Sequence, residues 1–238
     1  MNLFQTYNKL YVYLKQNGIE FSKEGFPIFK ENMFTDDVPK EILPFNRRNE
    51  CKNKKKTALC TCQVDKEIYP RIEHLDQDLE EWKSFMACIV FDLSPRLEWR
   101  SEIQKFNICL NQMSAIYLAL HGVKLIGNLR VGSLNTIGAL YSYPTETCFL
   151  VGSLGCTKYL SIEDLDYFST KILITLPKRL YFYGSLEKHV EKLIKGYGIP
   201  YKVFPPRREI SFAKYREALG KNVWRKTWLS VEGKNSKI

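Results

Sequence analysis

The sequence predicts an α/β protein with a mostly parallel sheet of about five strands and covering helices, arranged as an open sheet or a partial barrel. An irregular N-terminal region precedes this body. Between residues 84 and 204, short apolar segments alternate with longer segments of helical periodicity, which is typical of strand–helix–strand units. The apolar segments are nearly continuous, as expected for strands that are buried on both faces of a parallel sheet.

The first 82 residues are expected to form a helix and an irregular basic region. Leu3, Leu10 and Leu14 recur at helical spacing, and Gly18 follows as a stop signal, so an amphipathic helix should begin the chain. After it, the sequence favours in turn an irregular segment, a basic loop, a short strand and a helical turn, at residues 19–45, 46–57, 58–65 and 78–82.

Residues 83–206 are expected to form the α/β body. Its first strand, in FMACIVFDLS, is a continuous apolar run that ends in Asp92 and Ser94 before Pro95. An apolar stripe with alternating steps of four and three residues predicts the longest helix over residues 98–121. The other expected elements are strands at 123–132, 148–155, 179–183 and 200–204, helices at 161–173 and 186–195, and an irregular connection at 133–146.

Polar side chains follow three of the predicted strands. Parallel strands place their carboxyl ends at one edge of a sheet, and sites in such sheets form beyond that edge. We therefore predict a catalytic set of Asp92, Asn128, Arg130 and Ser153. Asp92 could act as a general base or a metal ligand, or it could cap the turn before Pro95. Arg130 could bind a phosphate or carboxylate through its bidentate fork, or it could pair with Asp92.

Two further polar features are candidates for supporting roles. Gly184 and Ser185 form a turn between a strand and a helix that could bind an anion at the helix N-terminus, or Ser185 could simply cap that helix. Asn107, Asn111 and Ser114 form a polar row on the long helix, which predicts a hydrogen-bonded contact between this helix and the sheet. Asn107 could also support the site indirectly, by positioning a site residue without contacting a ligand itself.

The formal charge of +10 is concentrated in two segments. Residues 45–57 hold six Lys or Arg and one Glu, and the basic C-terminal extension, residues 207–238, holds nine Lys or Arg and three Glu. Concentrated positive charge attracts phosphate-rich polymers, so both segments are predicted to contact DNA or RNA, although a solvated loop and a frayed tail would have the same composition. The predicted contact residues are Arg47, Arg48, Lys54, Lys55, Lys56, Arg207, Arg208, Arg216, Trp224, Arg225 and Lys226.

The cysteine content and the N-terminus indicate a cytoplasmic protein without a membrane partner. The seven cysteines are odd in number and have no disulfide-rich spacing, and no apolar run approaches the length of a membrane span. Cys60 and Cys62, with Cys51 and His74 nearby, resemble a metal site only loosely, because their spacing is not that of a zinc knuckle or ribbon. No metal is predicted, and no motif specifies a cofactor.

Four stretches of the body resemble, in their order and spacing, a family known as a domain of unknown function (family 4417) from bacterial and phage genomes. They are FDLS, NICLNQMSAIYLALHGVKLIGNLRVG, FLVGSLGC and LPKRLYFYG, within residues 85–205. Gly127 and Val131 depart from the family pattern, which often has proline and tryptophan there. By resemblance, the stressed positions are Asp92, Ser94, Asn107, Asn128, Arg130, Gly132, Ser153, Gly155, Tyr183 and Gly184.

The resemblance implies an association with mobile elements and assigns no reaction. Three hypotheses follow from it and from the residues. The first is a nucleic-acid-binding protein of a phage or other mobile element, which contacts DNA or RNA through the two basic segments. The second is an enzyme that acts on a phosphate-bearing substrate at the carboxyl ends of the strands, and the third is an inhibitor that binds a host factor.

Overall fold

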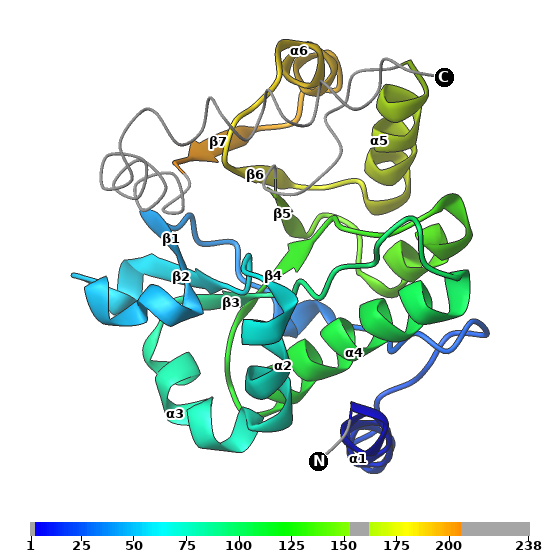
Figure 1. The fold of residues 1–238 in the computed structure, drawn as a ribbon. Coiled ribbons are helices and arrows are strands. Elements are labelled where there is room, and N and C mark those ends of the chain that lie inside the picture. Colours follow the sequence, from blue (N-terminus) through cyan, green and yellow to red (C-terminus); the bar gives the residue numbers. More distant parts are fainter. Residues whose placement is uncertain (1–2, 153–161, 206–238) are drawn as a thin grey trace, which may run out of the picture. The chain divides into compact units, whose positions relative to one another are not determined.

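A seven-stranded parallel sheet forms the centre of the computed structural model, which describes residues 3–152 and 162–205 (Figure 1). These residues fall within one compact unit that ends at Pro205. Every neighbouring pair of strands is parallel, and the order of strands in the sheet follows the chain. The strands are β1 (Glu41–Pro44), β2 (Thr57–Cys60), β3 (Ala87–Ile89), β4 (Leu125–Asn128), β5 (Cys148–Gly152), β6 (Arg179–Tyr183) and β7 (Tyr201–Phe204).

The predicted α/β class and the parallel sheet are confirmed, but the described sheet contains two strands more than the five expected in the body. The strand expected within 58–65 is β2, and it pairs with β3 in the main sheet. β1 was expected to be irregular, because its four residues include Glu41 and end in Pro44. A proline is tolerated there since β1 pairs on one side only, with β2. The α/β body therefore begins near residue 41.

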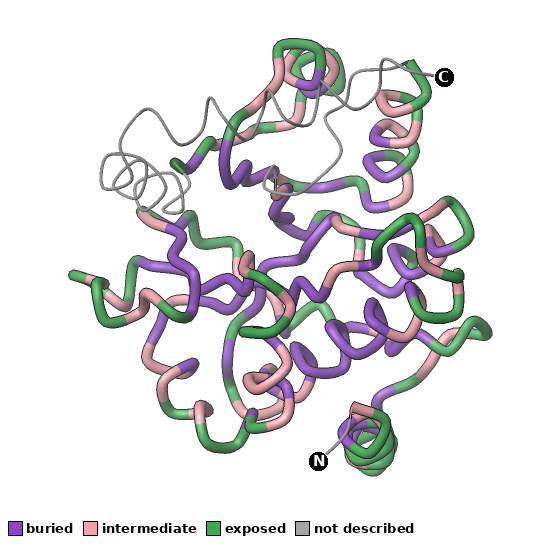
Figure 2. Tube along the Cα trace, in the orientation of Figure 1, coloured by how far each residue is buried: buried purple, intermediate pink, exposed green. Residues whose placement is uncertain are grey.

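The sheet nearly closes into a barrel. Two hydrogen bonds connect its last strands to the segment before β1, from Lys202 Nζ to the Pro39 carbonyl at 2.7 Å and from the Tyr181 hydroxyl to the Asp37 carbonyl at 3.4 Å. Figure 2 shows that the strands are buried throughout most of their length. One apolar cluster fills the concave face, and it consists of Ile42, Ala58, Cys60, Ala87, Ile89, Ile126, Cys148, Leu150, Tyr181, Tyr183 and Phe204.

Helices cover the outer face of the sheet, where a larger apolar cluster joins them to the strands (Figure 1). The long helix α4 is buried along most of its length. The α-helices are α1 (Leu3–Gln16), α2 (Asp65–Glu73), α3 (Leu75–Ser84), α4 (Ser101–Leu120), α5 (Ile162–Thr175) and α6 (Lys188–Gly196). Short 3₁₀ helices are η1 (Glu31–Met33), η2 (Phe45–Glu50), η3 (Lys54–Lys56) and η4 (Leu134–Ser142).

The helices α1, α4 and α5 confirm the predicted ones within a few residues. α2 and α3 replace the single helical turn expected at 78–82, and η4 occupies the connection expected to be irregular. α6 begins at Lys188 with Glu187 at its N-cap, so Ser185 does not occupy the N-cap position of this helix. No helix of the described chain has both the length and the apolar character that a membrane span requires.

Candidate functional site

Asp92 and Arg130 meet at the carboxyl edge of the sheet, where β3 and β4 lead into their connections. The Arg130 Nη1 atom lies 3.0 Å from Asp92 Oδ2, which confirms the predicted alternative of an ion pair. Asn128, the last residue of β4, donates from Nδ2 to Asp92 Oδ1 at 3.2 Å. The strand ends thus bring together three of the four residues predicted as catalytic. Ser153, the fourth, lies outside the described residues.

Ser94 completes this group, because its Oγ lies 3.5 Å from Arg130 Nη2. We refer to Asp92, Ser94, Asn128 and Arg130 as the Asp92 cluster. The Oδ1 atom of Asn128 also accepts a hydrogen bond from the backbone N–H of Arg130 at 3.2 Å. The side-chain amide of Asn128 therefore positions both the Asp92 carboxylate and the backbone of Arg130, the cationic partner of Asp92.

Two residues that the sequence did not single out hold the backbone of the cluster. Thr61 Oγ1 accepts from the Asp92 N–H at 2.9 Å, and Asp65 Oδ1 accepts from the Ser94 N–H at 3.0 Å. The alternative in which Asp92 caps this turn is therefore wrong, since Asp65 at the start of α2 does so. Thr61 and Asp65 follow β2, and the sequence did not indicate their role because β2 was not expected to join the main sheet.

The polar row on α4 anchors the same loop, as predicted. Asn111 accepts from the Leu93 N–H at 2.9 Å and donates to the Leu93 carbonyl at 3.1 Å. Asn107 donates to the Ser94 carbonyl at 3.0 Å. These bonds satisfy buried backbone groups beyond the end of β3 and hold the chain directly after Asp92. Ser114 instead bonds within the helix, to the Leu110 carbonyl.

The environment of Asp92 disfavours its charged form. The residue is 7 % exposed, and burial raises the pKa of its carboxyl, although Arg130 and the hydrogen bond from Asn128 act in the opposite direction. Asp65 adds a smaller upward contribution to this pKa. A hydrogen bond with Cys60, together with burial, raises the pKa of the neighbouring Cys62 thiol. The carboxyl of elevated pKa in the cluster therefore has a thiol of elevated pKa, that of Cys62, nearby.

This arrangement is suited to proton transfer beside a bound anion. Each Asp92 oxygen accepts one hydrogen bond from a neighbour in the cluster and has capacity for another. The Arg130 side chain is 23 % exposed and that of Asp92 only 9 %, so an anion arriving from solvent would meet the guanidinium first. Among the described residues, no group of three or more His, Cys, Asp or Glu side chains is placed to hold a metal ion.

Comparison with known families gives a match to the domain of unknown function DUF4417 over residues 22–198. The chain belongs to this family. The match confirms the resemblance and extends it toward the N-terminus, so that it includes β1 and β2. No curated protein and no solved structure is significantly similar to the chain.

Gly127 and Val131 are the chain neighbours of Asn128 and Arg130, and both have apolar surroundings. A Cβ atom on Gly127 would lie 2.4 Å from the Phe149 ring, so Phe149 takes up the space above Gly127. Val131 is 7 % exposed and belongs to the apolar cluster between sheet and helices. Both positions therefore affect packing around β4 rather than the polar groups at the strand ends.

The basic segment 45–57 of the DUF4417 domain is divided between two edges of the sheet. η2 follows the carboxyl end of β1, whereas η3 precedes the amino end of β2. Since β1 and β2 are parallel four-residue strands with a rise of ~3.3 Å per residue, about 13 Å separates these edges. Arg47 pairs with Glu50. The long side chains of Arg48 in η2 and Lys54 in η3 bridge the separation, because both reach the Glu81 carboxylate. Carboxylates thus neutralise part of this segment.

Of the remaining residues predicted to contact nucleic acid, the structure describes two, both in η3. Lys55 and Lys56 are exposed in η3. Gly184 and Ser185 lie four and three residues before Lys188, the first residue of α6, and anion binding at this turn stays a prediction. The predicted C-terminal contacts lie outside the described residues, and they are Arg207, Arg208, Arg216, Trp224, Arg225 and Lys226.

Proposed function

We propose that this DUF4417 protein is an enzyme that acts on a phosphate-bearing substrate at the carboxyl edge of its sheet. The observation that carries the proposal is the Asp92 cluster itself, in which a carboxyl group of raised pKa lies 3.0 Å from an arginine that reaches solvent. Buried acids with shifted pKa values and a specific charged partner are concentrated at functional sites. The position beyond the strand ends of a parallel barrel-like sheet adds independent support.

Each residue of the cluster has a distinct role in this proposal. Arg130 binds the phosphate, because its planar guanidinium matches two phosphate oxygens at once. Asp92 exchanges a proton with the substrate, and its raised pKa brings it closer to the pH at which such exchange is efficient. Asn128 orients Asp92 through the 3.2 Å hydrogen bond and is a positioning residue.

The proposal is tested with a panel of nucleotides, sugar phosphates and short oligonucleotides incubated with the full chain and followed by phosphorus and proton NMR. At least one compound should be converted by the wild type. Asp92→Asn should reduce the rate by about 100-fold or more while retaining binding, and Arg130→Gln should weaken binding. Asp166→Asn, an exposed acid on α5, is the matched control. If the wild type neither binds nor converts any phosphate compound, the proposal fails.

Nucleic-acid binding through the basic segments is a second candidate. Its support is the exposed pair Lys55 and Lys56 in η3 together with the charge of residues 207–238. A filter-binding titration of an oligonucleotide should then show affinity that falls steeply as salt rises, because phosphate contacts release counterions. An affinity that does not change between low and physiological salt would remove this candidate.

A further inference from the structure

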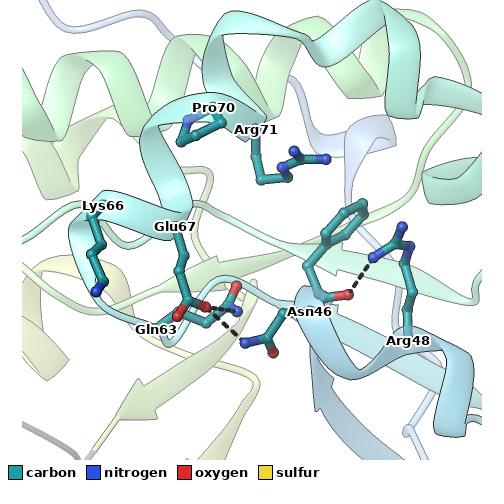
Figure 3. A pocket seen from close by; sticks show the side chains of 8 residues that line it. Asn46, Arg48, Gln63, Lys66, Glu67, Pro70 and Arg71 are labelled. Carbon is teal, nitrogen blue, oxygen red and sulfur yellow. Dashed lines mark hydrogen bonds between the residues drawn. The ribbon is translucent and has the colours of Figure 1, made fainter.

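A polar cavity lies between η2 and α2 (Figure 3). Its volume of about 530 Å³ is in the range of small-ligand sites. Three of its lining side chains are cationic, one is anionic and two are amides. The lining consists of Phe45, Asn46, Arg48, Gln63, Lys66, Glu67, Pro70 and Arg71. None of these residues belongs to the Asp92 cluster.

The two arginines are held in place on a rigid aromatic base. The Cζ atoms of Arg48 and Arg71 lie 4.4 and 5.6 Å from the centre of the Phe45 ring, which is itself stacked on Trp82 at 4.3 Å. Phe45 is 2 % exposed, so it supports the arginines and offers no face for stacking with a ligand. The cavity therefore presents charged side chains to a ligand and no exposed aromatic face of Phe45.

Acidic residues outside the lining orient these arginines without saturating them. Arg71 Nη1 lies 2.6 Å from Asp78 Oδ2, and Arg48 Nε lies 3.8 Å from Glu81 Oε1. Arg48 also donates from Nη1 to the Phe45 carbonyl at 3.2 Å. Within residues 3–152 and 162–205, the Nη2 atom of each arginine makes no hydrogen bond to the protein, so both retain donors for an anion.

The opposite side of the cavity carries Glu67 and Lys66. Figure 3 shows Glu67 beside Gln63 and Asn46, with the two arginines across the opening. Glu67 Oε2 accepts from Asn46 Nδ2 at 2.7 Å and from Gln63 Nε2 at 2.8 Å, so its carboxylate is fixed at this side. Lys66 is exposed and forms no ion pair within the described chain. The lining thus retains an excess of positive charge.

The loop between β2 and α2 is a wall that the cavity shares with the Asp92 cluster. Thr61 bonds to the Asp92 backbone, and Gln63 donates from its N–H to the Thr61 carbonyl at 2.7 Å. Asp65 bonds to the Ser94 backbone on one side of the loop, while the next residue, Lys66, lines the cavity. Adjacent strands are ~4.8 Å apart, so the cavity beyond β1 and β2 is roughly 5–15 Å from the cluster beyond β3 and β4.

We propose that the cavity between η2 and α2 binds a phosphate group through Arg48, Arg71 and Lys66. Guanidinium groups with free donors on a fixed base are the usual partners of phosphate oxygens, and the open cavity admits a phosphate that belongs to a larger molecule. The inference goes beyond the proposed enzymatic function, because the cavity binds phosphate whether or not Asp92 exchanges a proton.

The test uses two exposed positions whose substitution should change binding in opposite directions. Lys66→Ala should weaken binding about two- to fivefold. Glu67→Gln should strengthen it by a similar factor, because the substitution replaces a negatively charged carboxylate by a neutral amide of nearly the same shape. Lys9→Ala and Glu20→Gln are controls with the same changes in net charge at exposed positions outside the cavity. Binding of the full chain is measured by calorimetry with pyrophosphate and by fluorescence anisotropy with a labelled single-stranded oligothymidylate.

The two probes identify the source of the phosphate. Opposite shifts with both probes, or with pyrophosphate alone, support a site for a small phosphorylated ligand, and opposite shifts with the oligonucleotide alone support a site for a nucleic-acid backbone. If Lys66→Ala and Glu67→Gln behave as their controls with both probes, the inference is overturned. That result leaves the proposed function intact, because conversion that is abolished by Asp92→Asn depends on different residues.

Discussion

Burial and pairing act in opposite directions on Asp92. Desolvation raises its pKa, while Arg130 and Asn128 stabilise the charged form, and the net direction is upward. A carboxyl group whose pKa is raised by folding weakens the fold when it is ionised. The ion pair with Arg130 therefore offsets part of the free-energy cost of burying the Asp92 carboxylate. Because the buried position of Asp92 does not stabilise the fold when the carboxyl is ionised, we interpret this position as functional.

Arg130→Gln should make stability depend more steeply on pH. The Asp92 contribution is fully present below the unfolded pKa near 3.8 and is lost as the pH rises through the higher folded pKa. Without the guanidinium the folded pKa rises further, so the variant should lose about 1–3 kcal/mol at pH 7 and less near pH 4. Denaturant titrations at both pH values measure this. An equal loss at both would show that Asp92 is not the cause.

Gly132→Ala should destabilise the loop that follows Arg130. A Cβ atom at this position would lie 2.0 Å from Gln104 Oε1, which accepts a hydrogen bond from the Ser133 N–H at 2.7 Å. Displacing Gln104 leaves buried groups unsatisfied, and we expect a loss of about 1–3 kcal/mol. In Gly196→Ala the new methyl group meets nothing within 4 Å, so thermal unfolding of that variant should be unchanged or slightly improved.

At the scale of elements, α4 acts as a template for the end of β3. β3 has only three residues, and the chain beyond it has backbone groups that the neighbouring strands do not fully pair. The Asn111 side chain bonds to both the N–H and the carbonyl of Leu93, as the backbone of a neighbouring strand would. The position of Asp92, one residue earlier, depends on this substitute pairing.

Asn111→Ala should therefore cost more than an ordinary loss of one side-chain hydrogen bond. It leaves the buried N–H and carbonyl of Leu93 without partners, and we expect a loss of roughly 2–4 kcal/mol in denaturant unfolding. Ser114→Ala lies on the same helix but removes only a bond to Leu110 within that helix. This control should change stability by less than about 1 kcal/mol. Similar losses in the two variants would contradict the template role of Asn111.

Elements with strong apolar patterns were predictable from the sequence, and elements defined by tertiary pairing were not. The continuous apolar runs identified β3 to β7, and the apolar stripe identified α4. β1 is short, contains Glu41 and Pro44, and forms a strand only because β2 lies beside it. α2 contains an internal Pro70, which weakened its helical pattern.

The Asp92–Arg130 pair was predictable because parallel strands share one carboxyl edge. The hydrogen bonds of Thr61 and Asp65 to the backbone of the cluster were not predictable, because they depend on the course of the chain after β2.

At the scale of the whole described unit, the near-closure of the sheet depends on few contacts. Lys202 Nζ bonds to the Pro39 carbonyl at 2.7 Å, and the Tyr181 hydroxyl bonds to the Asp37 carbonyl. These bonds connect β6 and β7 to the segment that enters β1. Every strand pair of the described sheet, by contrast, joins two strands that are consecutive in the chain.

Lys202→Met should loosen this junction without unfolding the molecule. Loss of one net hydrogen bond, about 1 kcal/mol, corresponds to roughly fivefold faster amide exchange in β1 and β7. Hydrogen-exchange mass spectrometry should show this change there and not in β3 to β5. Lys83→Met breaks an ion pair with Glu80 on α3, away from this junction, and serves as the control. Faster exchange throughout the sheet would show that Lys202 supports the whole fold.

The sequential order of the strands also bears on how the molecule assembles during synthesis. Each strand pairs with the one translated just before it, so pairing can advance from the N-terminus as the chain leaves the ribosome. The bond between Lys202 and Pro39, by contrast, spans 163 positions and can form only after β7 has emerged. Low average separation between contacting residues favours rapid folding, and the junction between the two ends should therefore be the last part to form and the first to open.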